Sequence, residues 1–133
     1  MWTVQNDVGR LVEARLTTGD STEVAECLSA IAGIVLRAAR PVVGLFDVSQ
    51  IRVLGRAEAD LLLKVMRDDN PRVERTAILV QGDALLEMQI ERLIRASAST
   101  NRQAFRLAGH AVRWLSPCLG PTELARLQLF LRV

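Results

Sequence analysis

The sequence predicts a single mixed α/β domain in which helices pack against a mostly parallel sheet of about five strands. Three observations support this fold class. The chain has 133 residues, which suits one domain, and half of them are apolar, so it can bury a core and is not a disordered chain. Short apolar runs alternate with amphipathic helical segments, and right-handed crossovers between such strands build a parallel sheet. The first two strands lie close enough in sequence to pair as an antiparallel hairpin at one edge.

The predicted elements begin with this hairpin and a long helix. Residues 3–5 and 10–16 show the alternating pattern of strands. Asp20 precedes Glu23 at the spacing of a capping box, in which side chains satisfy free backbone N–H groups at the start of a helix. Pro41 lacks an N–H group and therefore ends this helix.

A buried strand, a second helix and another strand follow. The run at 42–48 is almost continuously apolar, which is typical of a strand covered on both faces. The pattern next predicts a helix from about Arg56 to Asp69 and a strand at 76–81. Gly82-Asp83 is predicted to cap a third helix.

The last part of the chain predicts this third helix, a strand and further helical segments. Leu85 and Met88 lie off the inner stripe of the third helix. Residues 103–107 alternate as a last strand, and residues 110–115 are long enough for one or two helical turns. A terminal helix begins at Thr122, after a break marked by proline and glycine.

The composition excludes metal cages and disulfide scaffolds. The chain has two cysteines, Cys27 and Cys118, and His110 is its single histidine, which is too few ligands for a zinc site. We therefore expect neither a metal nor a cofactor. The N-terminus lacks a basic segment followed by an apolar run, and charges interrupt every apolar stretch before about 18 residues. The expected location is the cytoplasm.

No residue cluster predicts a reaction, so we expect no enzyme activity. His110 and Cys118 lie near the same break and could form a nucleophile with its base, but the default interpretation is an ordinary loop histidine and a partly buried thiol. Asp47 is a lone carboxylate at the end of a strand. Gly82-Asp83 lacks the spacing of phosphate-binding loops, and Asp83 would repel an anion.

The order of elements carries a family resemblance. A strand at 41–47 leads into Asp47-Val48-Ser49, a helix begins just past Gly55, a strand spans 75–80, and a closing segment spans 105–115. In this order the elements resemble the STAS domain, in particular its SpoIIAA-like branch related to anti-sigma-factor antagonists.

The resemblance covers roughly residues 2–116, which gives a STAS-like domain at 1–116 and an amphipathic helical tail at 117–133. It implies a regulatory module that binds another protein under the control of serine phosphorylation. In the family that serine lies in an Asp-Ser-Ser-Gly turn, whereas this chain has Arg52-Val53-Leu54-Gly55, in which only the glycine is kept. Ser49 is the nearest hydroxyl, and turn chemistry explains it. We therefore expect a binding domain without this switch.

Surplus apolar residues on the second helix and the tail predict where a partner binds. The turn before the second helix is included in the predicted surface because the resemblance places the family's regulatory turn there. The predicted partner contacts are Gln50, Arg52, Leu54, Arg56, Leu63 and Arg67. The tail is expected to pack on the same domain or on a partner, and the second helix or the C-terminal helix could pair two copies of the chain.

Two alternative functions remain open. The first is a binder of a lipid or small apolar ligand, held between sheet and helices. The second is a nucleic-acid or anionic-surface binder that uses the arginine-rich C-terminal third. Through Glu91 the chain has fourteen acids and ten bases, a net charge of −4, and from Arg92 it has one acid and seven bases, +6. These arginines are dispersed, and aromatic residues make up 4% of the chain, which is too few for base stacking.

Overall fold

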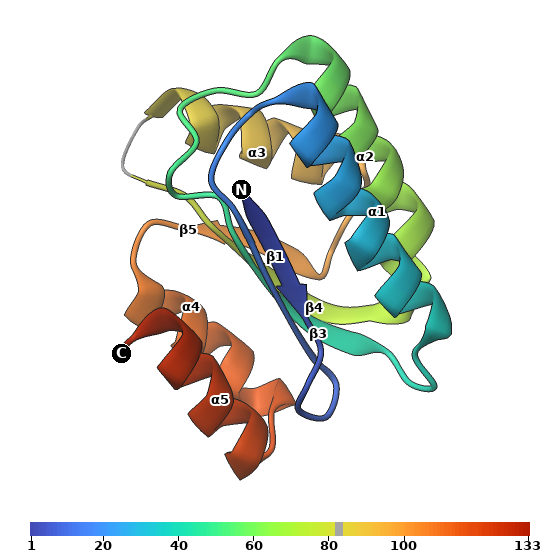
Figure 1. Ribbon diagram of the computed structural model, residues 1–133. Coiled ribbons are helices and arrows are strands. Elements are labelled where there is room, and N and C mark those ends of the chain that lie inside the picture. Colours follow the sequence, from blue (N-terminus) through green and yellow to red (C-terminus); the bar gives the residue numbers. More distant parts are fainter. Residues whose placement is uncertain (82–83) are drawn as a thin grey trace.

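Within residues 1–81 and 84–133, which the computed structural model describes, the strands form one five-stranded sheet (Figure 1). The strands lie side by side in chain order, β1-β2-β3-β4-β5. Their bounds are Trp2–Gln5 for β1, Leu11–Leu16 for β2, Val42–Asp47 for β3, Val73–Leu79 for β4 and Arg102–Phe105 for β5. β1 pairs antiparallel with β2, and the pairs that follow are parallel. The predicted hairpin and the mostly parallel sheet are therefore confirmed.

Helices cover both faces of this sheet. Their bounds are Ser21–Arg37 for α1, Arg56–Asp69 for α2, Ala84–Ala96 for α3, Ala108–Leu115 for α4 and Pro121–Leu131 for α5. α1, α2 and α3 lie on one face, and α4 and α5 lie on the opposite face (Figure 1). This layering suits a parallel sheet, because both of its faces are apolar. No helix in the described part of the chain is long and apolar enough to cross a lipid bilayer.

Helix boundaries agree with the local signals in the sequence. Asp20 caps α1, since its carboxylate accepts a hydrogen bond from the Glu23 N–H at 3.2 Å. α2 runs from Arg56 to Asp69, as predicted. The predicted cap of α3 at Gly82-Asp83 lies outside the described residues.

The strands β4 and β5 begin earlier than the sequence predicts. β4 starts at Val73, three residues before the predicted strand, and β5 starts one residue early. Glu74 and Arg75 are charged, so the sequence pattern did not indicate a strand at these positions. Glu74 pairs with Arg10 at 2.7 Å, and the Arg75 guanidinium lies 4.9 Å from the centre of the Trp114 ring. These contacts with distant residues compensate the two charges and allow both residues to lie in the strand.

The central strand β3 is covered on both faces, as its apolar run predicts, and all of its residues are buried. Val43 and Leu45 pack with Leu127 of α5. Phe46 belongs to the opposite core, where it packs with Leu62 of α2. Successive side chains thus alternate between the two helical layers, which is the geometry of an extended strand.

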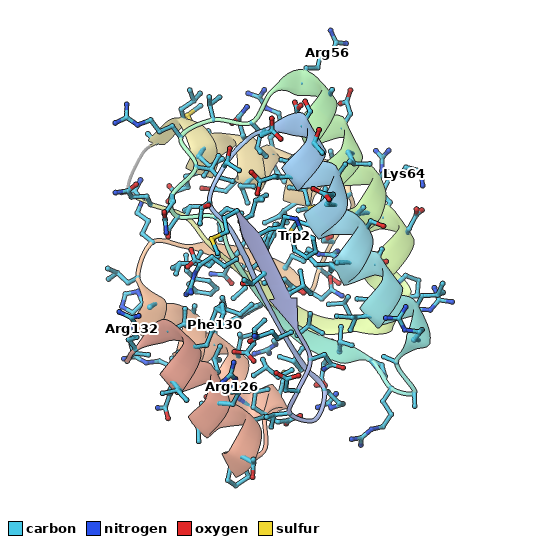
Figure 2. All side chains as sticks on the ribbon, viewed as in Figure 1. Trp2, Arg56, Lys64, Arg126, Phe130 and Arg132 are labelled. Carbon is cyan, nitrogen blue, oxygen red and sulfur yellow. The ribbon has the colours of Figure 1, made fainter. Side chains whose placement is uncertain are left out.

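α5 packs on the sheet of its own chain through apolar and ionic contacts. Leu127 has 0% of its surface exposed. The Arg126 guanidinium donates from Nε to Glu13 Oε1 and from a second nitrogen to Gln5 Oε1, both at 2.8 Å. Arg126 and Phe130 project from α5 toward the sheet (Figure 2). The C-terminal segment therefore forms part of a packed layer.

Candidate functional site

The loop at residues 48–55 joins β3 to α2 and has buried apolar anchors. Val48, Ile51 and Leu54 each expose 6% or less of their surface. The Val48 N–H donates to the Leu79 carbonyl at 2.9 Å, and the Ile51 N–H donates to the Val48 carbonyl at 3.0 Å. These contacts fold the loop onto the end of the sheet.

A glutamine on α3 holds the last part of this loop. The Leu54 N–H donates to Gln89 Oε1 at 3.0 Å, and Gln89 Nε2 donates to the Leu54 carbonyl at 2.9 Å. The Gln89 amide thus supplies the acceptor for the Leu54 N–H and the donor for the Leu54 carbonyl, as a neighbouring strand would. The loop is therefore attached to α3 at the residue that precedes the N-cap Gly55 of α2.

Asp47 closes the first part of the loop. One carboxylate oxygen accepts hydrogen bonds from the Ser49 N–H at 3.0 Å and the Ser49 hydroxyl at 2.6 Å. The other accepts from Arg15 Nε at 2.9 Å, and the Arg15 guanidinium lies 4.3 Å from the centre of the Phe130 ring. Asp47 therefore acts as a structural residue that connects the loop, β2 and α5.

The N-terminus of α2 has a carboxylate of its own beside it. Gly55 supplies no side-chain cap, and Glu58 in the first turn of α2 accepts a hydrogen bond from the Ser21 hydroxyl of α1. That hydrogen bond holds the pKa of Glu58 below its ordinary value. A negative charge at a helix N-terminus is favourable, so Glu58 stabilises the start of α2.

The structure corrects the prediction for Leu54. This residue was predicted to contact a partner, but it is 6% exposed and packs in the core. It stands between Val53 and Gly55, so no local period marks it as buried, and it is held by a contact with Gln89, 35 residues later. The adjacent Val53, which the sequence did not single out, is 47% exposed instead.

The other predicted partner contacts lie in separate places. Arg52 and Arg56 are exposed at the start of α2, and Arg56 points away from the molecule (Figure 2). Gln50 is exposed at the opposite end of the loop, where it lines a hollow beside the end of α5. Leu63 is half-buried in the core around α2, and Arg67 donates to the Ala96 carbonyl at 3.1 Å.

A more continuous candidate surface lies where the loop meets α3. The Gln89 contact with Leu54 attaches the loop that carries Val53 to α3. Leu85 and Met88, which lie on α3 off its inner stripe, are 52% and 57% exposed. We call this surface the loop–α3 face and define it as Arg52, Val53, Arg56, Leu85 and Met88.

The reactive residue types do not form a metal-binding cluster within the described residues. Burial raises the pKa of the Cys27 thiol to about 11. Burial and the nearby Glu74 also raise the pKa of Cys118, which opposes formation of a nucleophilic thiolate. His110 is exposed on α4. No group of three His, Cys, Asp or Glu side chains in the described part of the chain could hold a metal ion.

An apolar cavity of about 60 Å³ lies between the sheet and the helices α1 and α2. Its walls include Val12, Phe46 and Leu62. Asp69 and Arg102 supply polar groups at its lining. Asp69 is 7% exposed, and burial raises the pKa of its carboxyl despite the opposing effect of Arg102.

Comparison with solved structures identifies the fold. The structure of the anti-sigma factor antagonist SpoIIAA in its unphosphorylated form matches this chain with a TM-score of 0.62 and 14% sequence identity. The match covers 90% of this chain and 100% of SpoIIAA. The chain has a SpoIIAA-like fold.

A second solved structure shares this SpoIIAA-like fold. It is an uncharacterized protein of the DUF3478 family from Shewanella loihica, with a TM-score of 0.59, 17% identity, and coverage of 86% of this chain and 93% of that one. No protein-family model matches the sequence, and no curated protein is significantly similar to it. The predicted STAS-like architecture is therefore confirmed at the level of fold.

Proposed function

We propose that this protein is a non-enzymatic regulatory module that binds another protein through the loop–α3 face. The observation that carries this proposal is the exposure of Val53, Leu85 and Met88 next to a backbone held by Gln89. Exposed apolar side chains that lie together favour a protein partner. The flanking Arg52 and Arg56 supply the charged rim that such interfaces have around an apolar centre.

The fold supports the same proposal. SpoIIAA is described as an antagonist of an anti-sigma factor, which means that it acts on another protein. A shared fold alone does not transfer a function. The loop–α3 face adds an argument from this chain's own residues.

The proposed module works without serine phosphorylation in the β3–α2 loop. Ser49 is the single hydroxyl residue between Val48 and Gly55. Its hydroxyl donates to the Asp47 carboxylate at 2.6 Å, and a phosphate there would place about two negative charges against that carboxylate. The remaining residues of the loop offer no acceptor oxygen of this type.

The test compares proteins that tagged variants retain from the lysate of the native cells. We expect Val53→Asp and Met88→Asp to lose a protein that the unmodified chain retains, because a buried carboxylate at an interface lacks a partner. Leu36→Asp on α1 is the matched control, since Leu36 is 65% exposed and outside the loop–α3 face. Equal retention by all variants would contradict the proposed surface.

The apolar-ligand alternative is less well supported by the cavity under α1 and α2. Its volume is about 60 Å³. For comparison, an engineered apolar cavity that binds benzene has a volume of about 150 Å³. A lipid chain would therefore require the helices to move away from the sheet.

Three of the arginines in the C-terminal third make contacts within the molecule. Arg106 pairs with Glu87 at 2.6 Å, and Arg126 pairs with Glu13 at 2.8 Å. Arg102 donates to Ser99 at 2.9 Å beneath α2. These arginines hold elements together, so the charge asymmetry of the sequence overstates the positive charge available to nucleic acid.

A further inference from the structure

A second hollow lies on the opposite face of the sheet, between α4 and the strands β4 and β5. Its volume is about 480 Å³, and it opens to solvent. The lining residues are Arg75, Phe105, His110, Arg113, Trp114 and Pro117.

The charge of this hollow is one-sided. Arg75, His110 and Arg113 contribute basic groups, and its described lining includes no acid. Two other arginines on this side of the sheet are neutralised, because Arg15 and Arg126 make ion pairs of 2.9 and 2.8 Å. Glu74, next to Arg75 in the sequence, lies close enough for the two charges to act on each other, but it does not line the hollow.

The Arg75 guanidinium is held in position before any ligand arrives. It lies 4.9 Å from the centre of the Trp114 ring, and one of its nitrogens donates to the Trp114 carbonyl at 2.6 Å. No other acceptor for this guanidinium occurs in the described part of the chain. Since a guanidinium has five N–H donors, most remain for a ligand, and little side-chain freedom is lost on binding.

Aromatic rings form the remaining wall. Phe105 and Trp114 are half-buried, with ring centres 5.5 Å apart and planes inclined at 49°. Such a wall favours a flat apolar group, while the guanidinium groups favour an oxyanion that accepts several N–H donors. His110 and Arg113 lie three residues apart on α4 and so share one side of that helix.

We propose that this hollow binds a small organic anion in which a sugar links a phosphate to a flat ring, as in a nucleoside monophosphate. Arg75 and Arg113 contact the phosphate, and the ring lies against the wall formed by Phe105 and Trp114. The site is independent of the loop–α3 face, which lies on the other side of the sheet.

The test uses the fluorescence of Trp114. Trp2 and Trp114 are the two tryptophans of the chain, so Trp2→Phe leaves Trp114 as the single reporter. We expect adenosine monophosphate to change its emission saturably in the millimolar range or below. Adenosine and inorganic phosphate should each bind about tenfold more weakly, because each offers one half of the recognised chemistry.

Two further variants distinguish binding at this hollow from a nonspecific effect of the protein's positive charge. Arg113→Gln should weaken adenosine monophosphate about tenfold, since Arg113 is exposed and its loss leaves the fold intact. Arg92→Gln removes an exposed arginine from α3 and should leave the affinity unchanged. The proposal is overturned if adenosine monophosphate gives no saturable change, if inorganic phosphate binds equally well, or if both variants weaken binding alike. Tighter binding of a single-stranded oligonucleotide than of the mononucleotide would also overturn it.

Discussion

Gln89 on α3 completes the hydrogen bonding of Leu54 in the β3–α2 loop, with one side-chain amide bonded to both backbone groups at 2.9 and 3.0 Å. Leu54 is buried, so water cannot readily replace these bonds when the amide is removed. These two hydrogen bonds link the shape of the loop to the position of α3. They therefore connect the loop residues of the loop–α3 face with its α3 residues.

Gln89→Leu should therefore loosen the loop. We expect the free energy of unfolding to fall by about 1–3 kcal/mol, because a buried N–H and carbonyl lose their partners. Hydrogen exchange of the Leu54 amide should accelerate in the same variant. Arg92→Gln serves as the control, because Arg92 lies on the same helix and is exposed. An unchanged Leu54 exchange rate in Gln89→Leu would show that the amide does not hold the loop.

Arg126→Leu should destabilise the protein strongly. Glu13 is 1% exposed, and its Oε2 atom lacks a hydrogen-bond partner, so Arg126 provides the neutralising charge. Removing Arg126 leaves the buried Glu13 carboxylate without a compensating charge, which is costly. The double variant Glu13→Leu with Arg126→Leu should regain much of this loss, as measured by chemical denaturation.

Arg106→Gln is the comparison for that pair. Arg106 Nε lies 2.6 Å from Glu87 Oε2, so this pair is as close as the pair of Arg126 and Glu13. The Arg106 side chain, however, is 54% exposed. Solvent screens such a surface pair, so its contribution to stability is small. A larger loss in Arg106→Gln than in Arg126→Leu would contradict the role assigned to burial.

Asp69→Asn should stabilise the protein near neutral pH. Burial raises the pKa of Asp69, so the folded state binds its proton more tightly than the unfolded state. The unmodified protein therefore gains stability as the pH falls through the raised pKa, and carries the full cost of the buried charge above it. The Tm advantage of Asp69→Asn should be largest at about pH 7 and shrink toward about pH 4. A similar advantage for Asp68→Asn, whose carboxylate is exposed, would assign the effect to net charge instead.

Truncation after Leu115 should expose one face of the sheet. Burial of Leu127 alone contributes about 2 kcal/mol, and its removal uncovers Leu11 and Leu45. We expect a lower Tm and a larger mass by light scattering as exposed faces associate. The same mass and the same Tm for the shortened chain would show that α5 contributes little.

The local sequence determined the kinds of element and many of their bounds. The capping carboxylate of Asp20, the helix from Arg56 to Asp69 and the buried run that became β3 follow from signals within a few residues. Such signals act through backbone hydrogen bonds and through the period of apolar side chains, which depend on near neighbours. The mixed α/β fold class followed from their order.

The tertiary structure decided which polar and apolar side chains stay exposed. Glu13 lies in an alternating strand, where a charged residue predicts a solvent-facing position, yet Arg126 covers it from 113 residues later. Leu54 is likewise buried by a contact with Gln89, which leaves Val53 for the surface. These outcomes depend on which segments meet across the sheet, because burial and charge pairing are properties of distant residues brought together, and no local period encodes them.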